Sequence, residues 1–220
     1  RTILNFGIDE LRVVGRDGNW SDEARNRAKH AQQILDNCSH FETMKQAVED
    51  CSVVIGTSGK REIGDKISFR HFVTPEEIPK RLERVGGKVA FVFGPEDIGL
   101  TNEQLHECDF LLTIPTWEGY PILNLSHAVS IICYSWFSNI SDKNSNETQK
   151  SRLLDPELRR VLRSEVNRLV QNMSTKEHKK QGIEETMIRV LMRGLPKDDE
   201  IHRLLGVISQ AADSFDSSDQ

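Results

Sequence analysis

Two segments of the chain hold residues whose types and spacing could do chemistry. In 93–100 (Phe-Gly-Pro-Glu-Asp-Ile-Gly-Leu), Gly94 lets the backbone approach a ligand closely, and Glu96 adds a carboxylate just before a helix. In 114–128, Asn124 places an amide at the start of a helix that is otherwise almost fully apolar. These groups could line a ligand pocket that offers one acid and one amide. An ordinary strand-to-helix turn and a helix cap are the purely structural alternatives.

A third segment, 56–61 (Gly-Thr-Ser-Gly-Lys-Arg), is similar to a phosphate-binding loop only at first sight. It lacks the four-residue spacer before Gly-Lys and the hydroxyl residue after it, which a P-loop requires. The chain also contains no G-x-G-x-x-G fingerprint and no G-x-S-x-G nucleophile elbow. The common dinucleotide, P-loop and serine-hydrolase motifs are therefore excluded.

Histidine and cysteine spacing argues against a metal site. No two histidines stand at H-x-x-x-H spacing, and the four cysteines form no C-x-x-C pair. We expect four free thiols in a reducing compartment and no metal. No apolar run reaches the ~18 residues that a membrane span needs, and the first residues show no signal-peptide pattern. These features predict a cytoplasmic location.

Strand and helix patterns alternate over residues 1–137, and they must position the segments named above. The expected strands are apolar runs, which is typical of a parallel sheet covered by helices on both faces. Ligands bind such sheets beyond the carboxyl ends of the strands, where loops 56–60, 94–100 and 115–122 begin. The strands are expected at 11–14, 52–55, 88–93 and 110–114, and the helices at 21–37, after Thr43, at 75–85, after Thr101 and at 123–137.

The C-terminal part of the chain lacks the alternation of strand and helix patterns. Residues 138–150 contain one apolar residue in thirteen and are expected to form a linker. Residues 151–220 carry three amphipathic helical faces, so we predict a small helical extension behind a 1–137 domain. The chain has a net charge of −5, but 158–180 holds seven basic and two acidic side chains. That segment is the best candidate for an RNA-binding surface, and a merely solvated helix face is the alternative.

Three ordered motifs together resemble those of a known enzyme family. F-G-x-E-x-x-G-L at 93–100 is followed by Ile-Pro at 114–115 and by L-N-L-x-x-A-V at 123–129. This order resembles the SPOUT-class RNA methyltransferases, and more closely their TrmH-type ribose 2′-O-methyltransferase group. Arg-x-x-x-Asn-Phe-Gly at 1–7, S-D-E-A-R at 21–25 and V-x-G-T at 54–57 are similar to the TrmJ branch, which methylates tRNA position 32. The resemblance implies a C-terminal trefoil knot in the α/β domain.

The resemblance also implies a cofactor and a set of contacts. The family binds S-adenosylmethionine in the knot and works as a homodimer with the active site between protomers. No membrane and no metal are implied. The motif positions that carry cofactor contacts in the family are here Thr57, Ser58, Gly59, Phe93, Gly94, Ile114, Ile122 and Leu123.

Catalytic and RNA-binding roles follow from the same match. Arg1 would approach the ribose or a phosphate, where a permanently charged guanidinium orients groups and stabilises charge. Glu96 would orient Arg1, with a helix-dipole role as its alternative, and Asn124 would hydrogen-bond the loop or the ribose. The RNA-binding candidates, each with plain solvation as its alternative, are Lys60 and Arg61 after the first loop and Arg159, Arg160 and Arg163 in the basic segment.

Two departures from the family pattern keep alternatives open. A strand and an N-x-G loop precede the motif arginine in the family, whereas this sequence begins at Arg1. The family serine before Leu-Asn is replaced by Ile122, so its hydroxyl is absent. An inactive knotted RNA-binding protein and a 2′-O-methyltransferase of ribosomal RNA are the alternatives to a tRNA enzyme.

Overall fold

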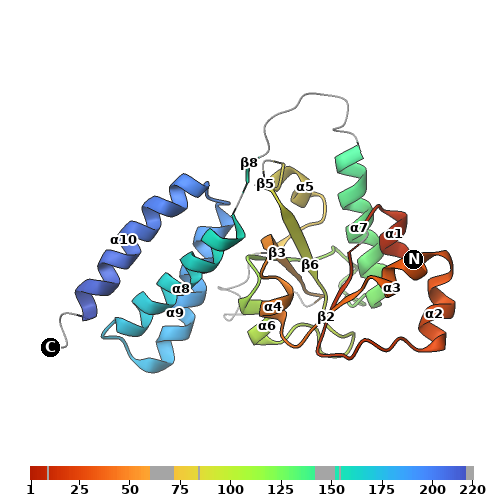
Figure 1. Cartoon of the computed structure of the whole chain (residues 1–220), viewed down its shortest axis with the longest axis horizontal. Helices are drawn as coiled ribbons and strands as arrows, with labels where there is room; N and C mark the ends of the chain where they lie inside the picture. Colours follow the sequence, from red (N-terminus) through yellow and green to blue (C-terminus); the bar gives the residue numbers. More distant parts are fainter. Residues whose placement is uncertain (9, 60–71, 84, 142–151, 154, 217–220) are drawn as a thin grey trace.

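The computed structural model of the chain describes residues 1–8, 10–59, 72–83, 85–141, 152–153 and 155–216 (Figure 1). The helices are α1 (Thr2–Asn5), α2 (Asp22–Ala28), α3 (Gln32–Asp36), α4 (Met44–Ala47), α5 (Glu77–Arg81), α6 (Asn102–His106), α7 (Leu125–Ser141), α8 (Pro156–Asn172), α9 (Glu177–Arg193) and α10 (Asp198–Asp216). The strands are β1 (Arg12–Val14), β2 (Ser39–Phe41), β3 (Cys51–Thr57), β4 (Phe72–Val73), β5 (Val85–Gly86), β6 (Lys88–Val92), β7 (Phe110–Leu112) and β8 (Arg152–Leu153).

The central sheet has the strand order β4-β7-β3-β6, and each of its pairings is parallel. Two short parallel pairs, β1 with β2 and β5 with β8, lie beside it. Because the four strands of the central sheet run the same way, the loops that follow β3, β6 and β7 leave it at the same edge. The predicted α/β class with a parallel sheet is confirmed.

Both faces of the sheet are covered, as alternate residues of β3 show. Val53 and Ile55 are completely buried in an apolar cluster that includes Ile132 of α7. Val54, which points the opposite way, is completely buried in a second cluster with Met44 of α4. This alternation explains why β3 is an unbroken apolar run, since a strand covered on both sides has no polar face.

The three C-terminal helices pack onto the same core. Leu162 and Val166 of α8, Met192 of α9 and Ile201 of α10 are completely buried, in one cluster with Val53 of the sheet. Figure 1 shows α8, α9 and α10 grouped on one side of the sheet, with α7 and α1 on the other. The predicted amphipathic faces thus bury their apolar sides against one another and against the sheet.

A buried ion pair joins α8 to the sheet. The Asp109 carboxylate is fully buried and accepts hydrogen bonds from Arg159 Nε at 3.0 and 3.1 Å and from the Val54 backbone N–H at 2.8 Å. Arg163 adds a further bond to Asp109 at 3.1 Å. Burial alone would lower the pKa of Arg159, but the charge of Asp109 and its hydrogen bonds outweigh that effect and raise the pKa. The Arg159 guanidinium therefore keeps its charge inside the protein.

Capping residues mark several helix starts as expected from the sequence. Ser21 accepts a hydrogen bond from the Ala24 N–H, and Thr43 and Thr101 each form a reciprocal capping box with a glutamine three residues later. Helix 21–37 is interrupted by a 3-10 turn at Lys29–Ala31, where Lys29 has a positive φ of 53°.

Other boundaries differ from the expectation. The helix expected at 123–137 runs instead from Leu125 to Ser141, so that 138–141 belong to α7 rather than to a linker. The rest of the expected linker, 142–150, lies outside the described residues. The short elements α1, β2, β4, β5 and β8 have no counterpart in the sequence-based assignment, because two- to four-residue segments carry too little periodicity.

Candidate active site

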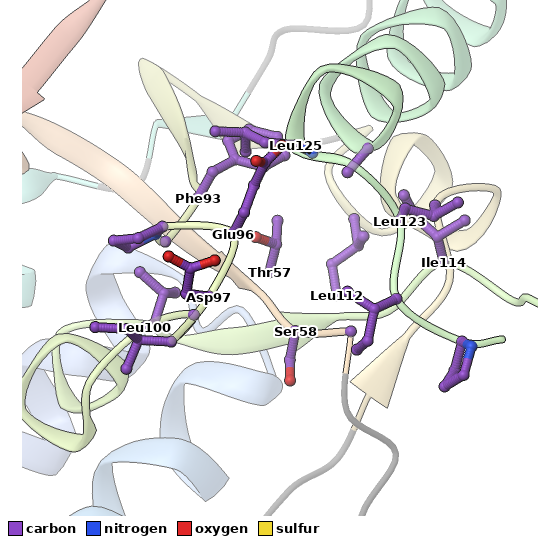
Figure 2. A pocket seen from close by; sticks show the side chains of 18 of the residues that line it. Thr57, Ser58, Phe93, Glu96, Asp97, Leu100, Leu112, Ile114, Leu123 and Leu125 are labelled. Atoms are coloured by element: carbon purple, nitrogen blue, oxygen red, sulfur yellow. Dashed lines mark hydrogen bonds between the residues drawn. The ribbon is translucent and has the colours of Figure 1, made fainter.

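A cavity of about 420 Å³ opens at the carboxyl ends of β3, β6 and β7 (Figure 2). Its walls come from the three loops that follow these strands and from the start of α7. Figure 2 shows Asp97 and Leu100 on one side, Ile114 and Leu123 on the other, and Thr57 between them. The volume lies in the range usual for sites that bind small molecules and cofactors.

All eight positions proposed for cofactor contact line this one cavity: Thr57, Ser58, Gly59, Phe93, Gly94, Ile114, Ile122 and Leu123. They come from three loops that are far apart in sequence, and only the parallel sheet brings them together. Their role in binding a cofactor stays a prediction. Leu112, Leu125 and Ile132 are among the further apolar residues of the wall.

Hydrogen bonds between neighbouring strands hold the first loop in place. The Ser58 N–H donates to the Leu112 carbonyl at 3.0 Å, and Thr57 Oγ1 donates to the Val92 carbonyl at 2.9 Å. The β3 end is thus tied to both β7 and β6. A β-carbon at Gly59 would lie 3.1 Å from Ile122 Cδ1, so the first and third loops are in close contact.

The second loop folds back on itself at Gly94. A β-carbon at this position would lie 2.2 Å from the Gly99 carbonyl carbon and 2.4 Å from the Leu100 nitrogen, which are backbone atoms. The turn is closed by a 2.8 Å hydrogen bond from the Gly99 N–H to the Pro95 carbonyl, and Gly99 has a φ of +72°. Both glycines are therefore needed for the loop to take this path.

Glu96 and Asn124 both serve the N-terminus of α7. Glu96 Oε1 accepts a 2.8 Å hydrogen bond from the Leu125 N–H. Asn124 Oδ1 accepts bonds from the Ser126 N–H at 3.0 Å and from the Ser126 hydroxyl at 2.7 Å, in the manner of a helix N-cap. Both residues therefore make the contacts expected from their structural alternatives: Asn124 caps α7, and Glu96 is an acid at the N-terminus of this helix. Asn124 Nδ2 has no protein partner in the described residues and remains available to a ligand.

Arg1 lies away from this cavity. Its side chain is exposed at the start of α1, which packs against α7. In the described ranges no hydrogen bond or ion pair joins Arg1 to Glu96, so the predicted orienting contact is absent within one chain.

Asp97 is a cavity residue that the sequence analysis did not select. It is exposed and lies between Glu96 and Ile98 in the lining of the cavity. In the sequence, its position inside the 93–100 motif is the feature that could have identified it as a site residue. Together with Glu96 it gives this side of the cavity a negative charge, which suits a cationic ligand.

The structure places Arg159 and Arg163, two of the residues expected to bind RNA, against acceptors inside the protein. The Arg159 residue is 5% exposed and bonds to Asp109 and the Glu107 carbonyl, and Arg163 donates to the His106 carbonyl at 2.7 Å and to Asp109. Because these two guanidinium groups donate to acceptors inside the protein, they are not presented to an RNA phosphate at the surface. Arg160 is exposed and paired with Glu157. Lys60 and Arg61 lie outside the described residues.

The described residues contain no cluster of three potential metal ligands. The four cysteines are unpaired there, and burial raises the pKa of Cys51 and Cys133 to about 11 and that of Cys108 to about 12. These three thiols stay protonated at neutral pH and are poor nucleophiles. Within the described ranges, no helix combines the length and the apolar character that a membrane crossing requires.

Known proteins resemble this chain in both sequence and structure. A model of the SpoU rRNA methylase family matches residues 1–134. The tRNA (cytidine-2′-O-)-methyltransferase TrmJ of Methanocaldococcus jannaschii is 40% identical over 186 residues, which cover 82% of this chain and 78% of that protein. The protein of the same name from Sulfolobus acidocaldarius is 30% identical over 210 residues, covering 94% and 84% of the two chains.

A solved structure agrees with these sequence relatives. The crystal structure of TrmJ from Z. mobilis superposes with a TM-score of 0.72 at 25% identity, and the match covers 95% of this chain and 89% of that one. The similarity therefore extends over the C-terminal helices as well as over the sheet.

Proposed function

Because the chain belongs to the SpoU rRNA methylase family, we propose that it methylates a ribose 2′-hydroxyl of tRNA with S-adenosylmethionine. The observation that carries the proposal is the cavity at the sheet edge, which gathers all eight expected cofactor positions. Two relatives with substantial identity are named as tRNA 2′-O-methyltransferases. We propose position 32 of the anticodon loop as the target, on the resemblance to the TrmJ branch.

The cavity suits S-adenosylmethionine in shape and charge. Ile114, Leu123 and Leu112 offer an apolar slot for the adenine ring, and the loop at Gly94 exposes main-chain groups beside it. Asp97 provides a negative charge for a cofactor that carries a sulfonium and an ammonium group. The bound cofactor would supply an activated methyl group. We propose that the loops form a trefoil knot around it, in the 1–137 domain that precedes a helical extension at 151–220.

Helix α7 carries an exposed apolar stripe. It is formed by Ile131, Tyr134 and Phe137, which are 38%, 59% and 44% exposed, respectively. Phe6 packs its ring against Tyr134 at 5.9 Å and against Phe137 at 6.1 Å, so α1 borders the stripe. We propose that a second copy covers this face and forms a cytoplasmic homodimer. Such a dimer would carry Arg1 of each protomer toward the cavity of its partner.

In this arrangement the chain's own residues prepare the ribose for reaction. Arg1 would orient the ribose and stabilise charge that develops as its 2′-hydroxyl reacts, because an arginine keeps its proton. Glu96 and Asn124 are positioning residues, since they hold the first turn of α7 behind Leu123. The free Asn124 amide would donate a hydrogen bond to the ribose.

Transfer of tritium from labelled S-adenosylmethionine to unmodified tRNA tests the function. We expect incorporation into tRNA and a nuclease-resistant dinucleotide at the methylated position. A tRNA whose position-32 ribose is already methylated is the control and should accept no label. Binding of the cofactor without transfer to any RNA would instead favour the inactive RNA-binding alternative.

Ribosomal RNA is the second candidate substrate, because the matching family is described by rRNA methylation. The same assay with unmodified rRNA fragments separates the two substrates. We expect a higher kcat/KM for tRNA. A preference for rRNA would overturn the proposed substrate but not the proposed chemistry.

Arg1→Ala is expected to lower kcat about 100-fold or more at saturating tRNA, because charge stabilisation acts mainly in the transition state. The affinity of this variant for tRNA, measured at two salt concentrations, should differ little from that of wild type. A normal kcat with weakened, salt-dependent tRNA binding would show that Arg1 only anchors a phosphate.

Mixed dimers test whether Arg1 acts across the interface. Arg1→Ala and Gly94→Ala chains, each inactive alone, would be unfolded and refolded together. If sites are shared, random pairing should restore about a quarter of the wild-type sites, since one site in each mixed dimer is intact. No recovery, with mixed dimers demonstrated, would contradict a shared site.

A further inference from the structure

Two large aromatic side chains stand almost fully in solvent beside the cavity. Trp117 is 78% and Tyr120 is 79% exposed, and both lie on the loop between β7 and α7. The same loop supplies Pro121 and Ile122 to the cavity wall. Neither ring belongs to the two apolar clusters of the core. Folding therefore does not explain them, and exposed aromatic rings commonly mark a binding surface.

The Trp117 ring is held in a defined position by the turn that follows it. A β-carbon at Gly119 would lie 2.4 Å from Trp117 Cη2 and 2.6 Å from both Cζ2 and Cζ3. These nearly equal, short distances place that position over the face of the six-membered ring, so the ring lies flat on the Gly119 backbone. The Tyr120 N–H donates to the Trp117 carbonyl at 3.0 Å, and Thr116 Oγ1 donates to the Pro121 carbonyl at 3.0 Å. One face of the indole is covered and the other is open.

We propose that the open face of Trp117 stacks on the base of the nucleotide whose ribose is methylated, with Tyr120 flanking that base. This inference rests on the proposed function. A ribose presented at the cavity must have its base close to the rim, and single-stranded RNA loops are recognised by stacking of bases on aromatic rings. Stacking tolerates any base because every base has a π-face.

The charges around the rings favour a base over a phosphate at this place. Glu118 lies between the two aromatic residues, and Asp97 faces the cavity from the second loop; both are exposed. In the part of the chain that the structure describes, neither carboxylate has an ion-pair partner. Uncompensated negative charge repels phosphates but leaves stacking of an uncharged base unaffected.

Trp117→Ala is expected to lower kcat/KM for tRNA about 10-fold or more, because removal of a stacking ring costs that much in affinity for a base. Trp117→Phe should recover most of the loss, since it keeps an aromatic face. Affinity for S-adenosylhomocysteine, measured by calorimetry, should stay unchanged. The slope of log Kd for tRNA against log salt should also stay unchanged, whereas loss of a phosphate contact would reduce it by about one.

Gly119→Ala supplies a variant that keeps the tryptophan but displaces it. Its φ is not in the left-handed region, so alanine is allowed there, but the new β-carbon must push the exposed ring away. We expect a loss of kcat/KM in the same direction as for Trp117→Ala. Val207→Ala is the matched control, because it removes an apolar side chain that is 67% exposed on α10, and it should behave as wild type.

Three results would overturn the inference. One is an unchanged kcat/KM in Trp117→Ala. The second is a Trp117→Ala protein that is monomeric by light scattering while wild type is dimeric, because the ring would then belong to a subunit interface. The third is a reduced salt slope. If Trp117→Ala weakens tRNA binding but wild type transfers no methyl group, the proposed function fails, and Trp117 is then a base-stacking residue of an RNA-binding protein.

Discussion

Gly94→Ala should abolish measurable binding of S-adenosylmethionine while the protein stays folded. The new β-carbon would meet the backbone of Gly99 and Leu100 at 2.2–2.5 Å, and backbone atoms cannot swing aside as a side chain can. Loop 94–100 must therefore open, which removes Gly94 and Asp97 from the cavity wall together. Calorimetry with the cofactor and with S-adenosylhomocysteine measures the loss, and circular dichroism checks the fold.

The matched control is Gly206→Ala in α10. A β-carbon there has no heavy atom within 4 Å, and alanine is the better helix former by about 0.5–1 kcal/mol. This variant should bind the cofactor normally and be slightly more stable than wild type. If Gly94→Ala binds the cofactor as well as Gly206→Ala does, loop 94–100 does not form the site.

Asp109→Asn should destabilise the protein by about 3–5 kcal/mol, the usual cost of breaking a buried ion pair. Asparagine keeps the shape but leaves the buried Arg159 charge unpaired beside the Val54 backbone. Because Arg159 belongs to α8 and Asp109 precedes β7, the loss should also loosen the C-terminal helices from the sheet. Urea unfolding gives the free energy, and limited proteolysis reports cleavage within 155–216.

Arg160→Ala is the control on the same helix. Its pair with Glu157 lies in solvent, with side chains 55% and 59% exposed, so that its loss should leave stability almost unchanged. Equal stability of the Asp109→Asn and Arg160→Ala proteins would mean that the buried pair contributes nothing to holding α8.

Local sequence patterns were enough to predict the class of fold and the segments that line the cavity. Apolar runs such as 52–55 specify strands covered on both faces, and Ser21, Thr43 and Thr101 specify helix starts, because both signals act over a few neighbouring residues. The 93–100 and 123–129 motifs, together with the segments 54–59 and 114–122, pointed to the family and to eight positions that all lie in the lining of the cavity. Motif residues are recognisable because their type and spacing are local properties.

The contacts that each side chain makes, in contrast, could be identified only from the folded molecule. The basic segment looks like an RNA surface, yet Arg159 and Arg163 turn inward, since Asp109 lies beneath α8 after a sequence separation of about 50 residues. Glu96 likewise serves the Leu125 N–H rather than Arg1. Nothing in the sequence distinguishes Trp117, whose ring is exposed, from an aromatic residue of the core. Contacts between distant segments depend on how the elements pack, and no local pattern encodes them.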